Sequence, residues 1–390
     1  MVPSGKGGVG GQGRSRAEVG LGQWRVELPQ TAVTGVDLQY KEGCRLLTHG
    51  RVQTILSGLR LTGEQLHPVD TAYRNPYFAN LWHRSSQTNL PLGLGGRHSI
   101  APTPAGVKQE NVMTDLIVDT HAHIYDDDEI RYPKIDEPYR PGPGIGDATH
   151  LLRVRHAHGI HKVVLVQTGS AYKWDNRLLA DRARGLQDWT TGVCNLDPEG
   201  PESVVAFTRL VAEDNVSALR LEATADGHYD HEGSRRLLAT AREIGAVICA
   251  HLQARYLNEL DQLLTAFPEL PVVLDHCAYP EGAAGPDSDT VRAVTALAKH
   301  PSLYAKLTFL VTKSEQPWPF ADTQAIARRV LDAFGPERCM WGSDFPCELW
   351  LKDRATYGQH LAVIREQMGL SPAEREQVLA GTALRVFFSA

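Results

Sequence analysis

The sequence predicts a (β/α)8 barrel, or TIM barrel, preceded by an irregular N-terminal extension. From Thr114 onward, short β-branched and apolar runs alternate with amphipathic helical stretches, a pattern typical of βα units in a parallel sheet. Eight such repeats occupy roughly 275 residues, close to the usual barrel size of about 250. An open doubly wound sheet is the alternative, but no glycine fingerprint follows the first predicted strand to favour it.

The eight predicted strands are each followed by a loop or a stretch with helical periodicity. The strands span residues 116–123, 161–168, 190–197, 216–223, 246–252, 271–277, 302–309 and 339–344. The helices span Ala148–Gly159, Asn176–Arg184, Pro201–Glu213, Glu232–Ile244, Tyr256–Ala266, Asp287–Lys299 and Thr323–Phe334. Because TIM-barrel active sites are assembled at the C-terminal ends of the strands, the last residues of each strand are the candidates for function.

Residues 1–112 differ from the barrel region in composition. They are rich in glycine and polar residues, are interrupted by proline, and show no sustained period of 3.6 or 2. The run Gly5 to Gly11 resembles the glycine loop of some P-loop ATPases, but no Lys-Ser/Thr pair follows it and no strand precedes it. We therefore interpret residues 1–112 as an irregular or disordered extension, and residues 113–390, which begin at Met113, as the barrel domain.

The overall composition is that of a soluble globular protein with a substantial core, at 42% hydrophobic and 22% charged residues. The formal net charge is -6 and the sequence pI is about 6.2, so no basic field exists to attract nucleic acid or an anionic membrane surface. A small-molecule substrate is the expected partner. The sequence leaves the oligomeric state open.

The six cysteines are scattered and include no CxxC pair, which suits a reducing compartment better than a disulfide scaffold. No run of about eighteen apolar residues could span a bilayer, and the N-terminus lacks the apolar core of a secretory signal. We therefore expect a cytoplasmic protein whose cysteines serve mainly in packing. Cys347 follows Asp344 closely enough to leave a nucleophilic role open.

The first predicted strand ends in a pair of histidines. In Asp119-Thr120-His121-Ala122-His123 a single residue separates the two histidines, so both imidazoles project from the same face of a strand. Such a pair can bind a metal ion through both imidazoles. An isolated His-x-His is as often a pair of ordinary polar residues where a strand meets its loop, so the interpretation depends on what lies downstream.

Three further potential ligands stand at the C-terminal ends of later strands. His251 ends the fifth strand, His276 the sixth, and Asp344 the eighth. A lone histidine at a strand end is more often a hydrogen-bonded structural residue than a ligand. Four imidazoles and one carboxylate at the same end of one barrel, however, form a set that suits zinc or a similar divalent ion with room for water.

The region from about Asp115 to Phe388 resembles the amidohydrolase superfamily, in particular the amidohydrolase-2 branch of 2-pyrone-4,6-dicarboxylate lactonase-like hydrolases. The resemblance rests on Asp119 to His123, His251, Leu274-Asp275-His276, Tyr304 to Thr308, and Trp341 to Pro346. It implies that His121, His123, His251 and Asp344 bind or replace a metal, that His276 lies beside it, and that Asp344 takes the proton of the attacking water.

The fourth predicted strand departs from the binuclear members of this superfamily. Those members carry a lysine there that is carboxylated and bridges two metals, but this strand reads Val216 to Glu222, with Arg220 and no lysine. We therefore expect at most one divalent metal, and zinc fits the ligand set. Because some members of the branch are thought to work without a metal, catalysis by the imidazoles alone stays open.

Opening of a lactone or related ester by water is the predicted reaction, and an amide is a further possible substrate. A metal lowers the pKa of bound water toward about 7 and polarises a carbonyl, and a nearby carboxylate can take the proton as water attacks. Asp344 fits that role, and His276 is the second candidate catalytic residue. If no metal binds, the clustered imidazoles could polarise the carbonyl as hydrogen-bond donors.

Five residues are candidate contacts to a carboxylated substrate. Arg220 and Lys306 are the candidate anchors, although ion pairs that support the barrel explain them equally well. Gln167, Tyr172 and Asn176 belong to a polar and aromatic loop after the second strand, which suits recognition or an ordinary helix lead-in.

Two other functions stay open. Related barrels with the same ligand pattern are nonoxidative decarboxylases of carboxylated aromatic or enol substrates, and nothing in the sequence excludes that reaction. A non-catalytic barrel that binds a ligand is the third interpretation. The retained ligand set argues against it, because buried polar groups are costly without a purpose.

Overall fold

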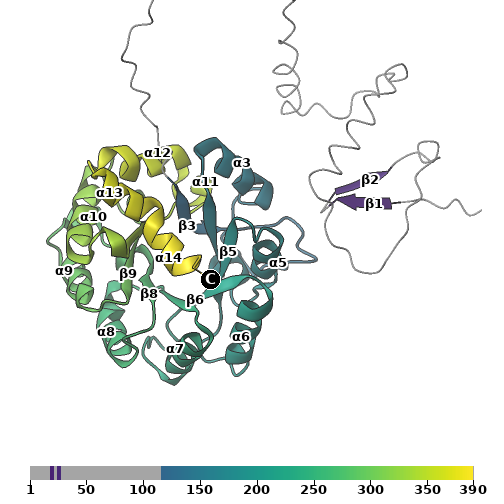
Figure 1. Cartoon of the computed structure of the whole chain (residues 1–390), viewed down its shortest axis with the longest axis horizontal. Coiled ribbons are helices and arrows are strands. Elements are labelled where there is room, and N and C mark those ends of the chain that lie inside the picture. The colour runs from purple at the N-terminus through teal and green to yellow at the C-terminus, as the bar shows by residue number, and fades with distance from the viewer. Residues whose placement is uncertain (1–17, 22–23, 28–115, 390) are drawn as a thin grey trace, which may run out of the picture. The chain divides into compact units, whose positions relative to one another are not determined.

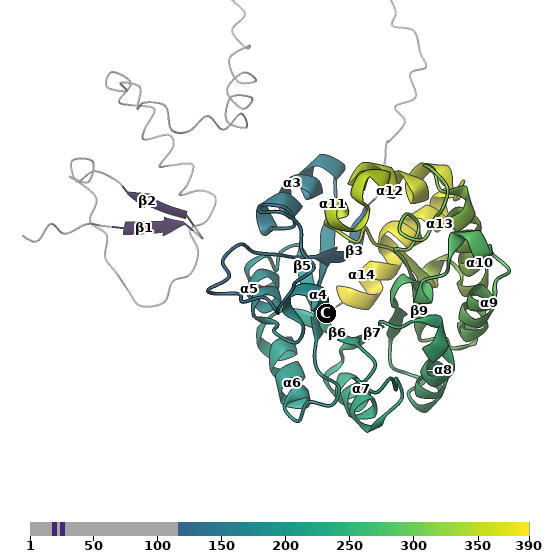
Figure 2. The same ribbon diagram turned by 180° about the vertical axis from the view of Figure 1, so that it is seen from behind.

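The computed structural model describes residues 18–21, 24–27 and 116–389. Residues 116–389 form the predicted barrel, with eight parallel strands in the order β10-β9-β8-β7-β6-β5-β4-β3 and a ring of helices around them (Figure 1). The view from behind shows the same ring of helices enclosing the strands (Figure 2). The predicted fold class is confirmed.

All eight predicted strands are present, and several end earlier than predicted because the chain turns into a loop. They are β3 (Val118–His123), β4 (Lys162–Val166), β5 (Thr190–Asn195), β6 (Val216–Leu221), β7 (Val247–Ala250), β8 (Val272–Leu274), β9 (Leu303–Leu307) and β10 (Cys339–Trp341). The residues after β8 and β10 that were predicted to be strand, including His276 and Asp344, lie in turns instead.

The seven predicted helices are present, and shorter helices follow the second and eighth strands. The α-helices are α3 (Ala148–His158), α4 (Gly169–Tyr172), α5 (Arg177–Gly185), α6 (Ser203–Glu213), α7 (Glu232–Ile244), α8 (Leu257–Ala266), α9 (Asp289–Ala296), α10 (Ala321–Phe334), α11 (Cys347–Trp350), α12 (Tyr357–Ala362), α13 (Pro372–Glu376) and α14 (Thr382–Phe387). Short 3-10 and π segments are η2 (Ala254–Tyr256), η3 (Asp275–Ala278), η4 (Gly282–Ala284), η5 (Leu297–Lys299), η6 (Pro336–Arg338), η7 (Lys352–Arg354), η8 (Val363–Gln367) and η9 (Gln377–Gly381).

Local sequence signals set the helix ends. Asp147 begins α3 by accepting a hydrogen bond from the His150 N–H at 2.6 Å, a typical N-cap. Gly159 ends the same helix in the left-handed conformation, with φ of 66°, which glycine adopts without a steric cost. Thr356 and Ser371 form capping boxes at α12 and α13.

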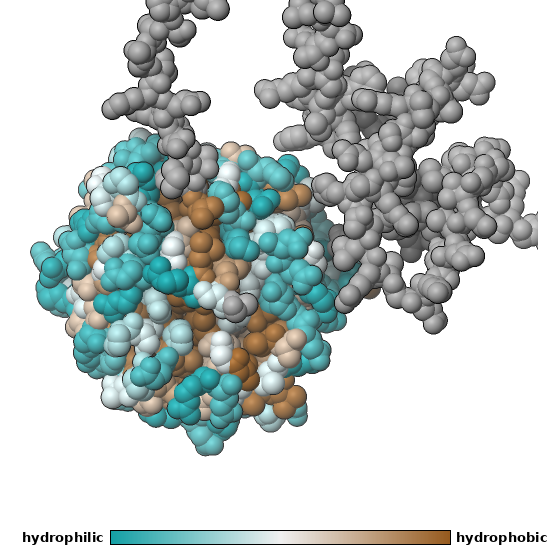
Figure 3. All heavy atoms as spheres, in the orientation of Figure 1, coloured by the Kyte–Doolittle hydropathy of each residue, from teal (hydrophilic) through white to brown (hydrophobic). Residues whose placement is uncertain are grey.

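The interior of the barrel is a packed apolar core. It is filled by Val164, Val166, Val193, Ala218, Val247, Cys249, Val273, Met340 and Phe387. Phe387 comes from α14, which lies inside the ring of outer helices in both ribbon views (Figures 1 and 2). On this face the hydrophobic residues gather toward the middle, whereas the surrounding helices are mostly hydrophilic (Figure 3). Cys249 therefore serves as a packing residue, as its position on the strand predicts.

The first and last barrel strands meet through a short seam. A parallel bridge joins Ala122 to Phe345, and the His123 N–H donates to the Phe345 carbonyl at 2.8 Å. Beside this bridge the Thr120 hydroxyl donates to the Trp341 carbonyl at 2.7 Å. The seam matters because β3 carries the histidine pair and the segment after β10 carries Asp344.

The Asp119 carboxylate ties this seam together from a fully buried position. It accepts hydrogen bonds from the N–H of Ser343 at 2.9 Å, the hydroxyl of Ser343 at 2.5 Å, and the hydroxyl of Tyr357 at 2.9 Å. Gly342 allows the segment after β10 to lie close to β3, since a Cβ at this position would lie 2.8 Å from the Cβ of His121. Burying a carboxylate is costly unless hydrogen-bond donors surround it, and the donors named above meet that need.

The described part of the N-terminal extension is a pair of antiparallel strands, β1 (Glu18–Leu21) and β2 (Trp24–Glu27). This hairpin was not predicted, because residues 1–112 show no sustained strand periodicity. The remainder of residues 1–112, including the glycine run Gly5 to Gly11, lies outside the described residues. Among the described residues, no helix is both long and apolar enough to cross a membrane.

Replacing Gly342 with alanine should strain the seam. The added methyl would meet the backbone and Cβ of His121, so we expect a loss of about 1–3 kcal/mol in the free energy of unfolding, measured by urea denaturation. Gly185→Ala is the matched control, because a methyl there meets no atom within 4 Å. Equal stability of the two variants would contradict the role assigned to Gly342.

A shortened chain that begins at Met113 should fold on its own. The strands, helices and core of the barrel all come from residues 116–389, so circular dichroism and thermal unfolding should match those of the barrel in the full chain. Aggregation of the shortened chain under conditions in which the full chain stays soluble would show instead that the extension is needed for folding.

Candidate active site

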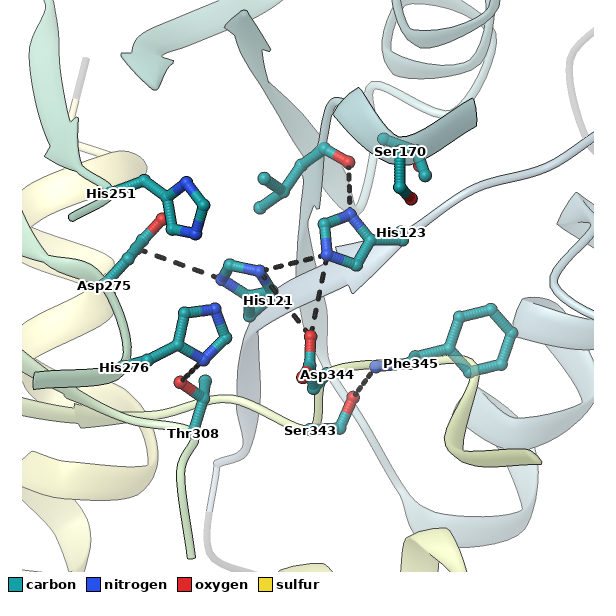
Figure 4. A network of polar contacts seen from close by, with 12 residues as sticks. His121, His123, Ser170, His251, Asp275, His276, Thr308, Ser343, Asp344 and Phe345 are labelled. Carbon is teal, nitrogen blue, oxygen red and sulfur yellow. Dashed lines mark hydrogen bonds and ion pairs between the residues drawn. The ribbon is translucent and has the colours of Figure 1, made fainter. Parts of the chain in front are cut away.

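Three predicted ligands lie together at the C-terminal end of the barrel. The Nε2 atoms of His121 and His123 are 3.3 Å apart, and each lies close to Asp344 Oδ1, at 3.7 and 3.6 Å respectively. The three side chains point toward one another, with His121 at the centre (Figure 4). Asp344 reaches this position from a left-handed backbone conformation, with φ of 58°, a geometry often found at functional sites.

The spacing of these atoms fits a single small divalent cation. A tetrahedral ion with bonds of about 2.0–2.2 Å separates its ligand atoms by about 3.3–3.6 Å. The three ligand atoms are all buried and lie within 4.8 Å of one another. His123 Nδ1 donates to the Val166 carbonyl at 3.0 Å, which turns the unprotonated Nε2 toward the cation position.

The two histidines of this group are held in the neutral form that binds metal. Burial, and then the charge of Lys306, keep the pKa of His121 well below its ordinary value. Burial, and then the charge of Arg220, lower the pKa of His123 to about 3. The Asp344 carboxyl responds in the opposite sense, because burial raises its pKa to about 7.

A buried ion cluster lies next to this group. The Asp275 carboxylate pairs with Lys306 Nζ at 2.8 Å and with Arg220 Nε at 3.1 Å. Lys306 Nζ also contacts His121 Nδ1 at 3.3 Å. Burial alone would raise the pKa of Asp275, but the Lys306 and Arg220 charges lower it, so the carboxylate stays ionised. The predicted alternative for the two cations, ion pairs that support the barrel, is present.

His276 and His251 lie beside the group. The His276 ring contacts the His121 ring, with centroids 4.7 Å apart, and its Nδ1 shares a hydrogen bond of 2.6 Å with the Thr308 hydroxyl. His251 Nδ1 donates to Glu222 at 2.7 Å, and its Nε2 shares a hydrogen bond of 2.6 Å with Tyr279. Both ring nitrogens of His251 are thus occupied by residues outside the three-ligand group.

A cavity of about 710 Å³ opens onto these residues. Its lining includes His123, Asp344, Arg220, His251, His276 and Tyr279. Trp350 also lines it and packs against His123, with ring centroids 5.6 Å apart. The volume is ample for a small organic substrate.

The other candidate substrate contacts lie behind the cavity wall. Gln167 donates to the Asp175 carbonyl at 2.7 Å, Tyr172 accepts from the Asp126 N–H at 3.0 Å, and Asn176 donates to the Asn195 carbonyl at 2.8 Å. Lys306 is fully buried as well. Of the described residues in the loop after β4, it is Gly169, Ser170, Lys173 and Trp174 that line the cavity.

The described cysteines are free and buried. Cys347 lies near the site, where its Sγ faces the Ser343 carbonyl at 3.9 Å. Burial raises the pKa of the Cys347 thiol well above its ordinary value, which keeps it in the unreactive thiol form. This environment disfavours the nucleophilic role that the sequence leaves open.

Asp275 and Tyr279 are functional-site residues that strand periodicity misses. On a continuous strand Asp275 would face the opposite way from His276. The strand ends at Leu274, however, and the following turn brings both side chains into the site. The signal available in the sequence was the presence of Asp275, His276 and Tyr279 within five residues, which is unusual for a buried strand.

A family comparison agrees with the fold. The amidohydrolase family model matches residues 118–388, which cover the whole barrel. The chain belongs to the amidohydrolase family. The resemblance predicted from the sequence motifs is therefore confirmed, and the His121, His123 and Asp344 group is a possible divalent-metal site of this amidohydrolase.

Three curated relatives act on lactones by name. The amidohydrolase is 31% identical to an L-fucono-1,5-lactonase of Burkholderia ambifaria over 34% of this chain and 47% of that one, so the match spans about half of that relative. It is 27% identical to the L-fucono-1,5-lactonase of Burkholderia multivorans over 70% and 97% of the two chains. It is 26% identical to the 4-sulfomuconolactone hydrolase of Rhizobium radiobacter over 58% and 75%.

A solved structure gives the same fold. An amidohydrolase from Burkholderia multivorans with bound zinc superimposes with a TM-score of 0.57 at 25% identity, over 70% of this chain and 99% of that chain.

Removing either histidine of the group should abolish metal binding. We expect about one equivalent of divalent metal per chain by elemental analysis, and its loss in His121→Ala and His123→Ala, because two ligands cannot hold the ion. His300→Ala is the control, since that ring pairs with Asp261. His251→Ala tests the remaining predicted ligand. Equal metal content in the wild type and both group variants would disprove the site.

Proposed function

We propose that this amidohydrolase opens the lactone ring of a small carboxylated substrate by attack of water. The observation that carries the proposal is the Asp344 carboxyl, held 3.6–3.7 Å from two neutral imidazoles at the wall of a cavity. A carboxylate in such a position can accept the proton of an attacking water. The names of the curated relatives, an L-fucono-1,5-lactonase and a 4-sulfomuconolactone hydrolase, support a lactone as the substrate class.

We assign the divalent metal to His121, His123 and Asp344, and we propose that it is zinc. Two imidazole nitrogens and one carboxylate oxygen are ligands that zinc prefers, and they leave a position open for water or substrate. When bound, the ion supplies polarisation of the substrate carbonyl and lowers the pKa of a bound water. The neutral state of both histidines favours binding.

Arg220 is the proposed anchor for the substrate carboxylate. It lines the cavity, and its guanidinium is held in place by Asp275 at 3.1 Å. A fixed guanidinium binds a carboxylate well, because its donors match the two oxygens. Lys306 is fully buried and contacts Asp275 and His121, so we propose that it supports the site and does not touch the substrate.

A screen of lactones tests the proposal. Purified protein should open at least one carboxylated or sugar lactone, with release of one proton equivalent as the product acid forms, measured by a pH indicator. Release of carbon dioxide from carboxylated aromatic substrates, with no lactone opened, would favour decarboxylation. A matched pair of carboxylated and uncharged lactones would report on the anchor, because Arg220→Gln should raise KM mainly for the carboxylated member.

Replacing Asp344 with asparagine should lower kcat. The amide keeps the shape but cannot accept the proton, and general base catalysis contributes about 10²- to 10⁴-fold. Because burial raises the pKa of Asp344 to about 7, the wild-type rate should fall as the pH drops through this pKa; a bound cation would shift the limb to lower pH. The Asp344→Asn variant should show no such acidic limb in its pH profile, because an amide does not titrate in this range. Near-normal kcat with an unchanged acidic limb would show that Asp344 is structural.

A further inference from the structure

The turn after β8 has an unusual backbone. His276, Cys277, Ala278 and Tyr279 all have positive φ, at 53°, 47°, 58° and 59°, and none of them is glycine. Left-handed conformations cost an L-residue roughly 1–2 kcal/mol each, so such a run persists only where the surrounding structure imposes it. The Tyr279 N–H donates to the His276 carbonyl at 2.9 Å and closes the turn.

This turn stacks Tyr279 on His276. With about three residues per turn, side chains at positions i and i+3 lie on the same side. The two rings are accordingly nearly parallel, with centroids 4.6 Å apart and an interplanar angle of 16°. Because His276 in turn contacts His121 at 4.7 Å, the His276 ring stands between the ligand group and the Tyr279 phenol.

The Tyr279 hydroxyl is the end of a hydrogen-bonded chain. His251 Nε2 lies 2.6 Å from it, and His251 Nδ1 donates to both oxygens of Glu222, at 2.8 and 2.7 Å. Glu222 Oε1 also accepts from the Asn195 amide at 3.3 Å. Glu222 on one side and the phenol on the other fix the His251 ring. The Tyr279 oxygen is therefore held at a set position where the residue lines the cavity.

Tyr279 faces the same cavity as Asp344. It is half-buried and lines that cavity together with His251 and Glu222. Opening a lactone needs two proton transfers: one from the attacking water, and one to the ring oxygen as its bond to the carbonyl carbon breaks. Asp344 can accept the first proton. The second needs a donor at another part of the same cavity.

We propose that Tyr279 is a catalytic proton donor of this site, and that Glu222 and His251 position it. The proposal rests on the lactone hydrolysis proposed above. As the bond between the carbonyl carbon and the ring oxygen breaks, its electron pair goes to the ring oxygen, which takes the hydrogen of the Tyr279 hydroxyl. Solvent then returns one proton to the Tyr279 oxygen and removes one from Asp344, so the net reaction is lactone plus water to hydroxy acid.

The test compares two lactones of one ring size that differ in the leaving oxygen. A saturated lactone releases a strongly basic alkoxide, whereas an enol lactone releases a less basic enolate that depends less on a proton donor. Tyr279→Phe keeps the ring stacked on His276 but removes the hydroxyl. We expect kcat to fall about 10²- to 10⁴-fold on the saturated lactone and only a few-fold on the enol lactone.

Two further variants keep the result interpretable. Glu222→Gln weakens the hold on His251 and should reproduce the selective loss on the saturated lactone to a smaller extent. Tyr132→Phe is the matched control, because the Tyr132 hydroxyl donates to Asp181 at 2.7 Å in a hollow lined by none of Glu222, His251 and Tyr279, and it should leave both rates unchanged. Thermal unfolding of each variant checks that the fold is intact.

The outcomes separate this role from the reaction on which it depends. If the wild-type protein opens lactones and Tyr279→Phe loses nothing, or loses equally on both substrates, the proton-donor role is overturned and lactone hydrolysis stands. If Tyr279→Phe does not fold, the rates of Glu222→Gln on the two lactones decide instead. A selective loss on the saturated lactone supports the role, and no loss or an equal loss overturns it. A wild-type protein that opens no lactone in the screen removes the proposed reaction and this role together.

Discussion

The buried Asp119 carboxylate is the interaction on which the site depends. It joins β3 to the segment after β10 by accepting from the Ser343 N–H, the Ser343 hydroxyl and the Tyr357 hydroxyl. The histidine pair follows Asp119 on the chain, and Asp344 follows Ser343. A shift at this seam would therefore change the distances among all three ligand atoms at once. The contacts that close the barrel therefore also set the geometry of the site.

The electrostatic state of the site follows from what lies beneath it. Two cations, Lys306 and Arg220, share one fully buried carboxylate, Asp275. A buried ion cluster contributes little net stability, because its desolvation penalty offsets the attraction between its charges. Its effect here is local: the cation charges add to burial in keeping the neighbouring histidines neutral. The arrangement suits a site that must bind a cation or polarise a carbonyl.

The sequence predicted the parts of the site that obey strand periodicity. His121 and His123 share a face because they stand two residues apart, and parallel strands bring the ends that carry His276 and Asp344 to one edge. Periodicity could not predict what happens once a strand ends. Asp275 enters the site because β8 stops one residue earlier. In the loop after β4, the polar side chain of Gln167 bonds to backbone carbonyls, a demand that local composition does not reveal.

The residues that line the cavity are held in place by different means. His123 and Asp344, which we propose to serve water attack, are held by β3 and by the barrel seam, so a large change there would also disturb closure. The positions of His251, His276 and Tyr279 depend on the turn after β8 and on Glu222 at the end of β6, neither of which takes part in closing the barrel. On the proposed mechanism, a substitution at Tyr279 or Glu222 would change which leaving groups are expelled readily, while the β3 histidines keep their place beside the barrel seam. Such a division would let one barrel keep its mode of water attack while its substrate range changes.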